Sequence, residues 1–246
     1  MKTILLKLKG PMQSWGTSSH FETRNTDYYP SKSAVIGIIA ACFGYRRDQD
    51  QDQDQEKAIK ALNELDFALR VDQPGMLLRD YHIAKKYQET GEVEQQYVTK
   101  RYYMEDSVFV VAISHADDER MEKIYEALKH PYFSPFMGRR SCPVPLDFII
   151  KMTEEDAITA LEKLEWQAAE WYKDWYKKKY ADYRAEIYAD KALLPQGIAT
   201  MRKDYVISFS QKERKFGPRF EVRKSINLSG SDGRCKNNDL DFYGSI

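Results

Sequence analysis

Hydrophobic and polar residues alternate at the start of the chain in a way that is typical of a β-strand. Every second position between Thr3 and Lys9 holds isoleucine or leucine, which places these side chains on one face. The pattern changes from Ala34 to Phe43, where an apolar run predicts a helix. Ser31 and Ser33 stand just before it. Serine is a common N-cap, so both are candidates for the residue at which this helix begins.

Further patterns up to Met152 complete a familiar order of elements. They predict a helix, two strands, a helix and a strand at Glu56–Leu65, Asp66–Asp72, Ser107–Ser114, Asp117–Lys129 and Leu146–Met152. Leaving aside the helix at Glu56–Leu65, the order with the first strand and helix is β-α-β-β-α-β, the ferredoxin-like or split βαβ arrangement. RNA-recognition domains share this order. We therefore predict an α/β (α+β) fold with a ferredoxin-like core.

An insertion from Met76 to Met104 separates the second and third strands of this core. Thr90-Gly91 lies near its middle and is flanked by Tyr87, Val93, Tyr97 and Val98. A glycine-containing turn between two alternating segments is typical of a β-hairpin. The insertion is therefore predicted to project from the core as a hairpin, which we call the thumb hairpin (residues 76–104).

The chain after Thr153 has a different character. Up to Asp190 the pattern predicts a long helix, either continuous or with a break, in which tryptophan and tyrosine recur every four residues around Trp171 and Trp175. The aromatic face fits packing on the chain's own sheet, and it also fits partial cover by a neighbouring subunit, because such residues are common at interfaces.

A basic strand pattern follows Pro195, centred on Tyr205–Phe209 and Phe220–Arg223. Ser229–Ile246 is polar and is predicted to be a loose tail. The sequence thus predicts two parts. A ferredoxin-like domain spans residues 1–152, and residues 153–246 hold the long helix, a smaller β-rich extension and the tail.

Composition excludes several classes of protein. The chain has 246 residues, 42% of them hydrophobic, which is enough for a core. No apolar run approaches the roughly 18–20 residues that span a bilayer, and the N-terminus lacks the apolar segment of a signal peptide, so a cytoplasmic protein without membrane contact is expected. The three cysteines form no closely spaced pair, which argues against a disulfide framework or a zinc site.

Net charge is zero, with 38 basic and 38 acidic residues, but the charges are segregated. Residues 1–47 hold seven lysines and arginines and two acidic residues, whereas residues 201–224 hold eight and three. Between the two, Asp48–Gln55 alternates aspartate and glutamine and is predicted to be a solvated loop. A polyanion responds to local field, so segregated basic segments leave nucleic-acid binding open.

Three segments have the chemistry of polyanion contacts. Gly10–Gly16 combines a turn with amide and hydroxyl donors and Trp15, which either stacks on a base or packs internally. Pro30–Ser33 opens a helix, where free N–H groups favour phosphate, although simple capping explains its serines equally well. Phe136–Pro143 places two arginines between glycine and proline without a nearby acidic residue, which suits phosphate or base-edge contacts.

Evidence for catalysis is weak. Tyr81-His82 beside Lys85 and Lys86 could supply the base and the cation that RNA cleavage needs, but a binding or structural histidine fits as well. The other histidines lack metal-ligand spacing, and no phosphate-loop, dinucleotide or zinc-protease motif occurs. We therefore predict no catalytic residue, metal or cofactor.

Four motifs in register resemble one family. They are GPMQSWG at 10–16, PSKSAVIGIIAACFG at 30–44, LRDYH at 78–82 and GRRSCP at 138–143, and a weaker similarity resumes at 203–209. Together they resemble the CasD subunits of type I-E CRISPR Cascade complexes, which belong to the RAMP superfamily. The aspartate/glutamine run and the aromatic-rich helix depart from the family pattern.

The resemblance implies a ferredoxin-like core with a thumb and a role at the 5′ end of the guide RNA. Family members hold the 5′ handle of the crRNA, dock on the terminal CasC backbone subunit and help to seat the large subunit CasA. Their thumb lies across the guide and displaces a nucleotide from the guide–target duplex, so base pairing reads the target DNA. Another subunit, CasE, cuts the precursor. Relatives in type I-C do cut RNA, so a metal-independent endoribonuclease remains the alternative.

The motifs and the resemblance together predict a set of RNA-binding residues. For the 5′ handle these are Gln13, Ser14, Trp15, Arg24, Ser31, Lys32, Ser33, Arg139, Arg140 and Ser141. For the guide backbone along the thumb hairpin they are Lys85, Lys86, Lys100 and Arg101.

Overall fold

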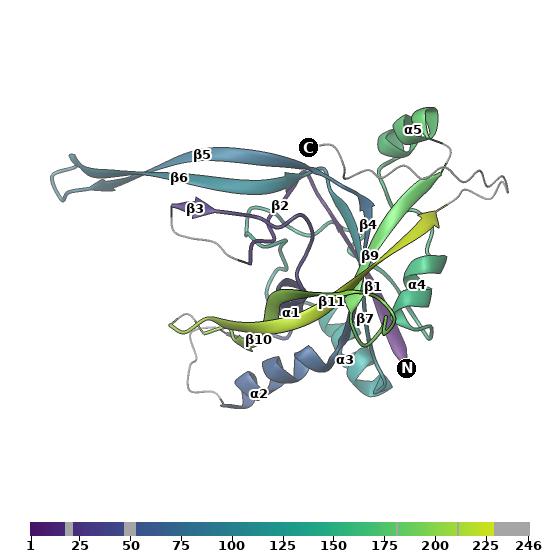
Figure 1. The fold of residues 1–246 in the computed structure, drawn as a ribbon. Coiled ribbons are helices and arrows are strands. Elements are labelled where there is room, and N and C mark those ends of the chain that lie inside the picture. Colours follow the sequence, from purple (N-terminus) through teal and green to yellow (C-terminus); the bar gives the residue numbers. More distant parts are fainter. Residues whose placement is uncertain (18–21, 47–52, 181, 211, 229–246) are drawn as a thin grey trace.

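A seven-stranded antiparallel sheet forms the centre of the molecule (Figure 1). The computed structural model describes residues 1–17, 22–46, 53–180, 182–210 and 212–228. Across the sheet the strands run in the order β10 (Ala199–Ser208), β11 (Lys215–Leu228), β9 (Tyr183–Asp190), β4 (Asp66–Gln73), β7 (Val108–His115), β1 (Lys2–Lys9) and β8 (Ile149–Thr153).

The predicted ferredoxin-like core is confirmed. Its elements follow one another as β1, α1 (Lys32–Cys42), β4, β7, α3 (Asp118–Lys129) and β8. In the sheet these four strands lie in the order β8-β1-β7-β4, that is, fourth, first, third and second, which is the split βαβ arrangement. Strands β9, β11 and β10 extend the same sheet beyond β4.

The remaining helices are short. They are α2 (Gln53–Ala61), the 3-10 turn η1 (Leu62–Glu64), α4 (Ala157–Lys163) and α5 (Glu170–Lys179). No helix in the described ranges is long and apolar enough to cross a membrane.

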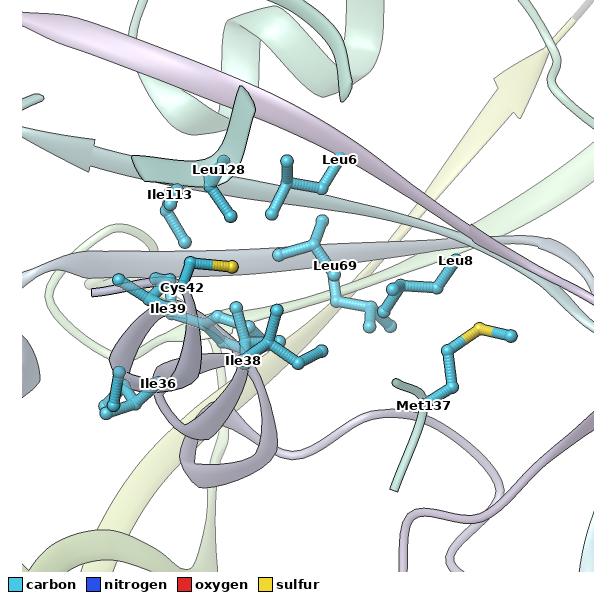
Figure 2. Close-up of a cluster of buried hydrophobic side chains, with 14 of the residues drawn as sticks. Leu6, Leu8, Ile36, Ile38, Ile39, Cys42, Leu69, Ile113, Leu128 and Met137 are labelled. Atoms are coloured by element: carbon cyan, nitrogen blue, oxygen red, sulfur yellow. The ribbon is translucent and has the colours of Figure 1, made fainter. Parts of the chain in front are cut away.

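Both faces of the sheet are buried at its central strands β4, β7 and β1, which explains their nearly continuous apolar sequence. One face packs against α1 and α3, and there Leu6 and Leu69 meet Ile39 and Leu128 (Figure 2). On the opposite face Leu5, with its neighbours in β4, β7 and β9, packs against α4. Successive strand residues point to opposite faces, so each contributes to one of two hydrophobic layers.

The thumb hairpin predicted for residues 76–104 is confirmed. It consists of β5 (Met76–Tyr87) and β6 (Val93–Glu105), which extend away from the body of the molecule (Figure 1). Gly91 has a φ of +86° in the turn, a conformation that glycine adopts without strain. At the base of the hairpin, β6 also pairs with two short strands, β2 (Met12–Gln13) and β3 (Thr23–Arg24).

The helix predicted for Thr153–Asp190 has the break that is one of its two alternatives, and the prediction is wrong for its last part. The segment contains α4, an irregular connection, α5 and strand β9. Helix α4 ends because the buried guanidinium of Arg70 donates hydrogen bonds to the carbonyls of Leu161, Leu164 and Glu165. A cation at the C-terminal end of a helix satisfies carbonyls that would otherwise continue the ladder.

The strand that replaces the end of the predicted helix has its own signal. Buried and partly exposed positions alternate along β9, where Tyr183, Ala185 and Ile187 point inward. This period of two was obscured by the preceding aromatic repeat, whose period of four continues to Tyr180. Pairing with β4 and β11 makes this segment a strand and not the end of a helix.

Other predictions at the element boundaries fare unequally. The aspartate/glutamine run Asp48–Gln55 is predicted to be a loop, but from Gln53 onward it belongs to α2. Residues 48–52 lie outside the described ranges. Strand β8 begins at Ile149 rather than Leu146. The tail from Ser229 lies outside the described ranges. The division at residue 152 stays a prediction, and strands from both sides of it share the seven-stranded sheet.

Candidate nucleic-acid interface

An open pocket of about 740 Å³ lies between α1, the base of the thumb hairpin, the loop before Ser141 and the β10–β11 pair. Most of the predicted handle residues line it, together with one thumb residue: Ser14, Trp15, Arg24, Ser31, Ser33, Arg101, Arg139, Arg140 and Ser141. Lys203 and Arg214 also contribute, which brings the basic residues to six. Among the described residues that line the pocket there is no aspartate or glutamate. The pocket is therefore suited to an anion.

The guanidinium of Arg139 is held in place along one edge and keeps a donor without a described partner on the other. It stacks over the ring of Tyr103 at 4.2 Å, and its Nη2 donates to the carbonyls of Arg24 (3.3 Å) and Tyr102 (3.4 Å). Its Nη1 is buried and has no hydrogen-bond partner, and the same holds for Nε of Arg101. The sequence predicts no acidic partner near Arg139, and its described contacts are two carbonyls and a tyrosine ring, with one N–H group left unpaired.

Gly138 positions these arginines. Its φ is +81°, and a Cβ at this position would lie 1.6 Å from the carbonyl oxygen of Ser14. A backbone bond from Ser14 N to the Met137 carbonyl (3.2 Å) ties the arginine loop to the first loop, and a bond from Met137 N to the Cys142 carbonyl (2.7 Å) closes the arginine loop on itself. Only glycine fits at this contact, so the arginine loop has one defined place against the first loop.

Trp15 and Gln13 have structural roles. The Trp15 side chain is 2% exposed, and its Nε1 donates to Oε1 of Gln13 at 3.1 Å. Gln13 in turn donates to the carbonyls of Leu8 (3.3 Å) and Ser107 (2.8 Å) and does not line the pocket. Of the two interpretations of Trp15, internal packing is the one that this burial supports. Base stacking by Trp15 and direct RNA contact by Gln13 do not fit the geometry.

Helix α1 begins at Ser31, whose Oγ accepts from the N–H of Ala34 at 3.2 Å. The prediction of phosphate binding at Lys32 does not fit its surroundings. Its Nζ pairs with Asp190 at 2.9 Å, and its backbone N–H donates to Asp204 at 2.9 Å. A carboxylate therefore already occupies the end of the helix dipole where a phosphate was expected. Simple capping, the alternative, explains Ser31, and both Ser31 and Ser33 still line the pocket.

A buried network of ion pairs lies beside α1 and joins strands β9, β10 and β11. Arg219 bonds to Asp204 at 2.7 and 2.9 Å, to Asp190 at 2.8 Å and to Glu221 at 2.7 Å. Burial alone would lower the pKa of Arg219, but the hydrogen bonds and charges of these carboxylates raise it above its ordinary value. The network fixes β10 and β11 against α1, and so holds Lys203 at the pocket. The basic segment 201–224 was the sequence signal for this part of the site.

The thumb residues divide into two groups. Arg101 lines the pocket at the base of the hairpin, where β6 pairs with β3. Lys85, Lys86 and Lys100 are exposed along the hairpin and do not line the pocket, and Lys86 pairs with Glu94 at 2.8 Å. They remain available for contacts outside the pocket.

His82 does not occupy a site built for cleavage. It lies on β5 opposite Thr99, half-buried, and does not line the pocket. In the part of the chain that the structure describes, no cluster of histidine, cysteine, aspartate or glutamate could hold a metal ion.

Comparison with known proteins gives one consistent answer. Residues 3–221 match the family described as CRISPR-associated protein (Cas_Cas5). The chain is 32% identical over 155 residues to "CRISPR system Cascade subunit CasD" of Escherichia coli (strain K12), covering 57% of this chain and 66%, just under two thirds, of that relative.

Two solved structures have the same fold. A chain of a "CRISPR RNA-guided surveillance complex" superimposes with a TM-score of 0.73 at 27% identity, over 93% of this chain and 92% of that one. The "Crystal structure of Cas protein" gives a TM-score of 0.60 at 25% identity, over 92% and 95%. With a family match that spans most of the chain, the protein described here belongs to the CRISPR-associated protein (Cas_Cas5) family.

Proposed function

We propose that the chain is a non-catalytic crRNA-binding subunit of a type I-E CRISPR Cascade surveillance complex, and that its pocket holds the 5′ handle of the guide. One observation carries this proposal. Six lysine and arginine residues converge on a pocket that no described acidic residue lines. A polyanion is the ligand whose binding such a field favours, and the family membership supplies crRNA as that polyanion.

The pocket offers both phosphate and base contacts. Arg101 and Arg139 each have a buried N–H group without a partner, and a guanidinium satisfies phosphate oxygens in a planar fork. The serine hydroxyls at the start of α1 add neutral donors. The rings of Phe136, Phe209 and Phe216 line the same space and give apolar area for bases.

The remaining partners follow from the relatives. We propose docking on a CasC backbone subunit, contact with a CasA large subunit, and a cytoplasmic complex in which the thumb hairpin meets target DNA near the handle. One relative is a Cascade subunit, and another belongs to an RNA-guided complex. Co-purification of this chain with such partners, followed by sequencing of the bound RNA, tests the proposal. Recovery of the complex without any RNA contact by this chain in crosslinking would contradict it.

His82→Ala is expected to leave precursor RNA uncleaved by the isolated protein, as the parent chain also leaves it. The described surroundings of His82 contain its strand partner Thr99, whose Oγ1 donates to the His82 carbonyl at 3.3 Å, and no metal cluster. The Nδ1 atom of His82 is buried without a hydrogen-bond partner among the described residues, so no carboxylate there orients the ring through that atom as general acid–base cleavage would need. The measurement is incubation with repeat RNA in the presence of EDTA. Cleavage by the parent that vanishes in the variant would favour the endoribonuclease alternative.

Deletion of Tyr87–Val98 is expected to leave the chain folded while impairing guide assembly or target binding. Every residue of this segment is exposed, so the free energy of unfolding should change by no more than about 1 kcal/mol. Thermal unfolding and a target-binding assay with the assembled complex are the two readouts. A variant that melts far below the parent, or one that binds target normally, would show that the distal hairpin has a different role.

A further inference from the structure

Helix α5 presents an aromatic face that lies outside the pocket. The helix contains no fully buried residue, which is unusual for a segment with two tryptophans and two tyrosines. It stands beside the ends of β9 and β11, outside the seven-stranded sheet (Figure 1). None of its residues lines the basic pocket.

The aromatic residues of α5 form two layers. The inner layer attaches the helix to the protein: the Trp166 ring stacks on Tyr183 at 4.3 Å, and Tyr172 and Tyr176 meet Trp166 edge-on at 6.1 and 5.9 Å. The outer layer consists of Trp171 and Trp175, which are 59% and 43% exposed. These inner contacts attach α5 to the rest of the protein. The exposed rings of Trp171 and Trp175 are not needed for that attachment.

Lysines surround the outer rings. Trp171, Trp175 and Lys178 stand at i, i+4 and i+7, so they share one face of the helix. Lys179 lies over the Trp175 ring at 4.6 Å. Within the described ranges no carboxylate pairs with Lys177, Lys178 or Lys179, whereas Lys173 does pair with Glu170 at 2.8 Å.

The electrostatic field over this face is positive. The pKa of Glu170 is lowered by its hydrogen bond from Lys173, and the charges of Lys177 and Lys9 act in the same direction. Helix α5 as a whole has four lysines against two acidic residues. Part of this charge complements the helix dipole, since three lysines stand in the last turn. The dipole accounts for the lysines there but not for the exposed tryptophans beside them.

We propose that the outer face of α5, formed by Trp171, Trp175 and Lys177–Lys179, binds single-stranded nucleic acid as a second site of this protein. The two tryptophans are one turn apart, about 6 Å along the helix axis, which suits two neighbouring unpaired bases. The lysines meet the phosphates on either side. Protein–protein interfaces also favour tryptophan but are poor in lysine, so the composition of this face favours a nucleic-acid strand over a protein.

The chemistry of the face predicts little distinction between DNA and RNA. Ring faces stack on any base, and lysines meet phosphates that both polymers share. The probes are therefore fluorescein-labelled 12-nucleotide oligothymidylate and oligouridylate, measured by fluorescence anisotropy. The full chain carries Arg139→Ala and Arg140→Ala in these titrations, so that the pocket contributes less. This site does not depend on the function proposed for the pocket.

In this background, Trp171→Ala with Trp175→Ala is expected to weaken binding of both probes at least about tenfold, since each base stack contributes on the order of tenfold. Trp171→Phe with Trp175→Phe should retain most of the affinity, because phenylalanine also stacks. Replacing the three lysines by glutamine should flatten the log–log salt dependence by about 0.7 for each phosphate that a lysine neutralises in the parent chain. The matched control is Phe220→Ala, which removes a ring that is 54% exposed on β11 and should change nothing.

A crosslinking readout locates the site directly. The same oligonucleotides with 5-iodouracil, irradiated and digested, should give adducts at Trp171 or Trp175 in the chain with and without the arginine changes. Adducts that persist when the pocket is disabled distinguish this site from the pocket. Unchanged affinity in the folded alanine variant, with no adduct on α5, would overturn the proposal. The proposal would also be overturned if the folded alanine variant still bound the oligonucleotides but no longer co-purified with protein subunits. If the alanine pair does not fold, as judged by circular dichroism, the glutamine variant and the adducts decide.

Discussion

Replacing Arg70 with methionine is expected to lower the free energy of unfolding by about 3–5 kcal/mol, because it leaves a buried carboxylate without its partner. Arg70 and Asp72 are both fully buried, and their side chains are joined by bonds of 2.6 and 2.7 Å. The same guanidinium satisfies the last carbonyls of α4. Urea unfolding followed by circular dichroism measures the loss. Lys123→Met, which breaks an exposed pair with Glu119, is the matched control and should leave the free energy of unfolding nearly unchanged.

The pH dependence of this variant provides an independent check. Burial raises the pKa of Asp72, and Arg70 opposes that rise. Without Arg70 the pKa of Asp72 should rise further, so the folded variant would bind a proton that the unfolded chain releases at neutral pH. A carboxyl group whose pKa is higher in the folded than in the unfolded chain favours the folded state at low pH, and this contribution is lost as the pH increases. The difference in the free energy of unfolding between the parent and Arg70→Met should therefore become smaller as the pH falls from 7 towards 4.

A second variant tests the cause of the destabilisation. Arg70→Met combined with Asp72→Leu removes both charges and should recover part of the stability, since an apolar pair tolerates burial. Recovery should stay incomplete, because the N–H of Gln167, which donates to Asp72 at 2.6 Å, is left without its acceptor, and the α4 carbonyls are left without their donor. Equal stability of the single and double variants would show that the unsatisfied carbonyls of α4, and not the unpaired charge, account for the effect.

The same pair shows where sequence reasoning on the fold reaches its limit. The first strand, the first helix and the helix after Asp117 carry their own signals, namely alternation, an apolar run and capping residues, and all three are confirmed. The end of α4 has no such local signal. It depends on Arg70, whose bonds to Leu161 and Leu164 span 91 and 94 residues. A charged residue in a strand gives no indication of that partner, so the local pattern does not show where the break falls.

The candidate site was predictable for similar reasons and to a similar extent. The arginine loop was visible because glycine and proline frame two arginines, and Gly138 indeed has the conformation that requires glycine. Lys32 looked equally suitable for phosphate. Its carboxylate partners, Asp190 and Asp204, lie 158 and 172 residues away, and only the extension of the sheet by β9, β11 and β10 brings them to α1. Local charge patterns identify cations but not which of them are already neutralised.

Replacing both Arg139 and Arg140 by alanine is expected to reduce affinity for handle RNA by roughly 2–4 kcal/mol, taking about 1.5–3 kcal/mol for each charged hydrogen bond and allowing for non-additivity. Each phosphate contact on single-stranded RNA contributes about 0.7 to the log–log salt slope, so the slope should flatten by roughly 1.4 if both residues touch phosphate. Titrations of handle RNA at several salt concentrations measure both quantities. Lys151→Ala with Lys163→Ala removes two charges outside the pocket lining and serves as the matched control.

The two arginines should contribute differently, because the structure holds them differently. Arg140 is exposed, whereas Arg139 stacks on Tyr103 and keeps its Nη1 inside the pocket wall without a partner. Arg139→Lys preserves the charge but removes the planar fork and the stack. It should therefore leave the salt slope close to that of the parent while affinity falls. Arg140→Lys should change neither strongly, since a point charge at an exposed position serves a phosphate almost as well.

This contrast separates specific contacts from a general electrostatic effect. If the pocket acted only through its summed charge, Arg139→Lys and Arg140→Lys would behave alike, and both would resemble the parent. If Arg139 binds a phosphate through the edge that has no protein partner, only Arg139→Lys loses affinity. A folded double alanine variant with unchanged affinity and unchanged slope would remove both arginines from the RNA site. Arg24, Arg101, Lys203 and Arg214 would then be left to bind the handle.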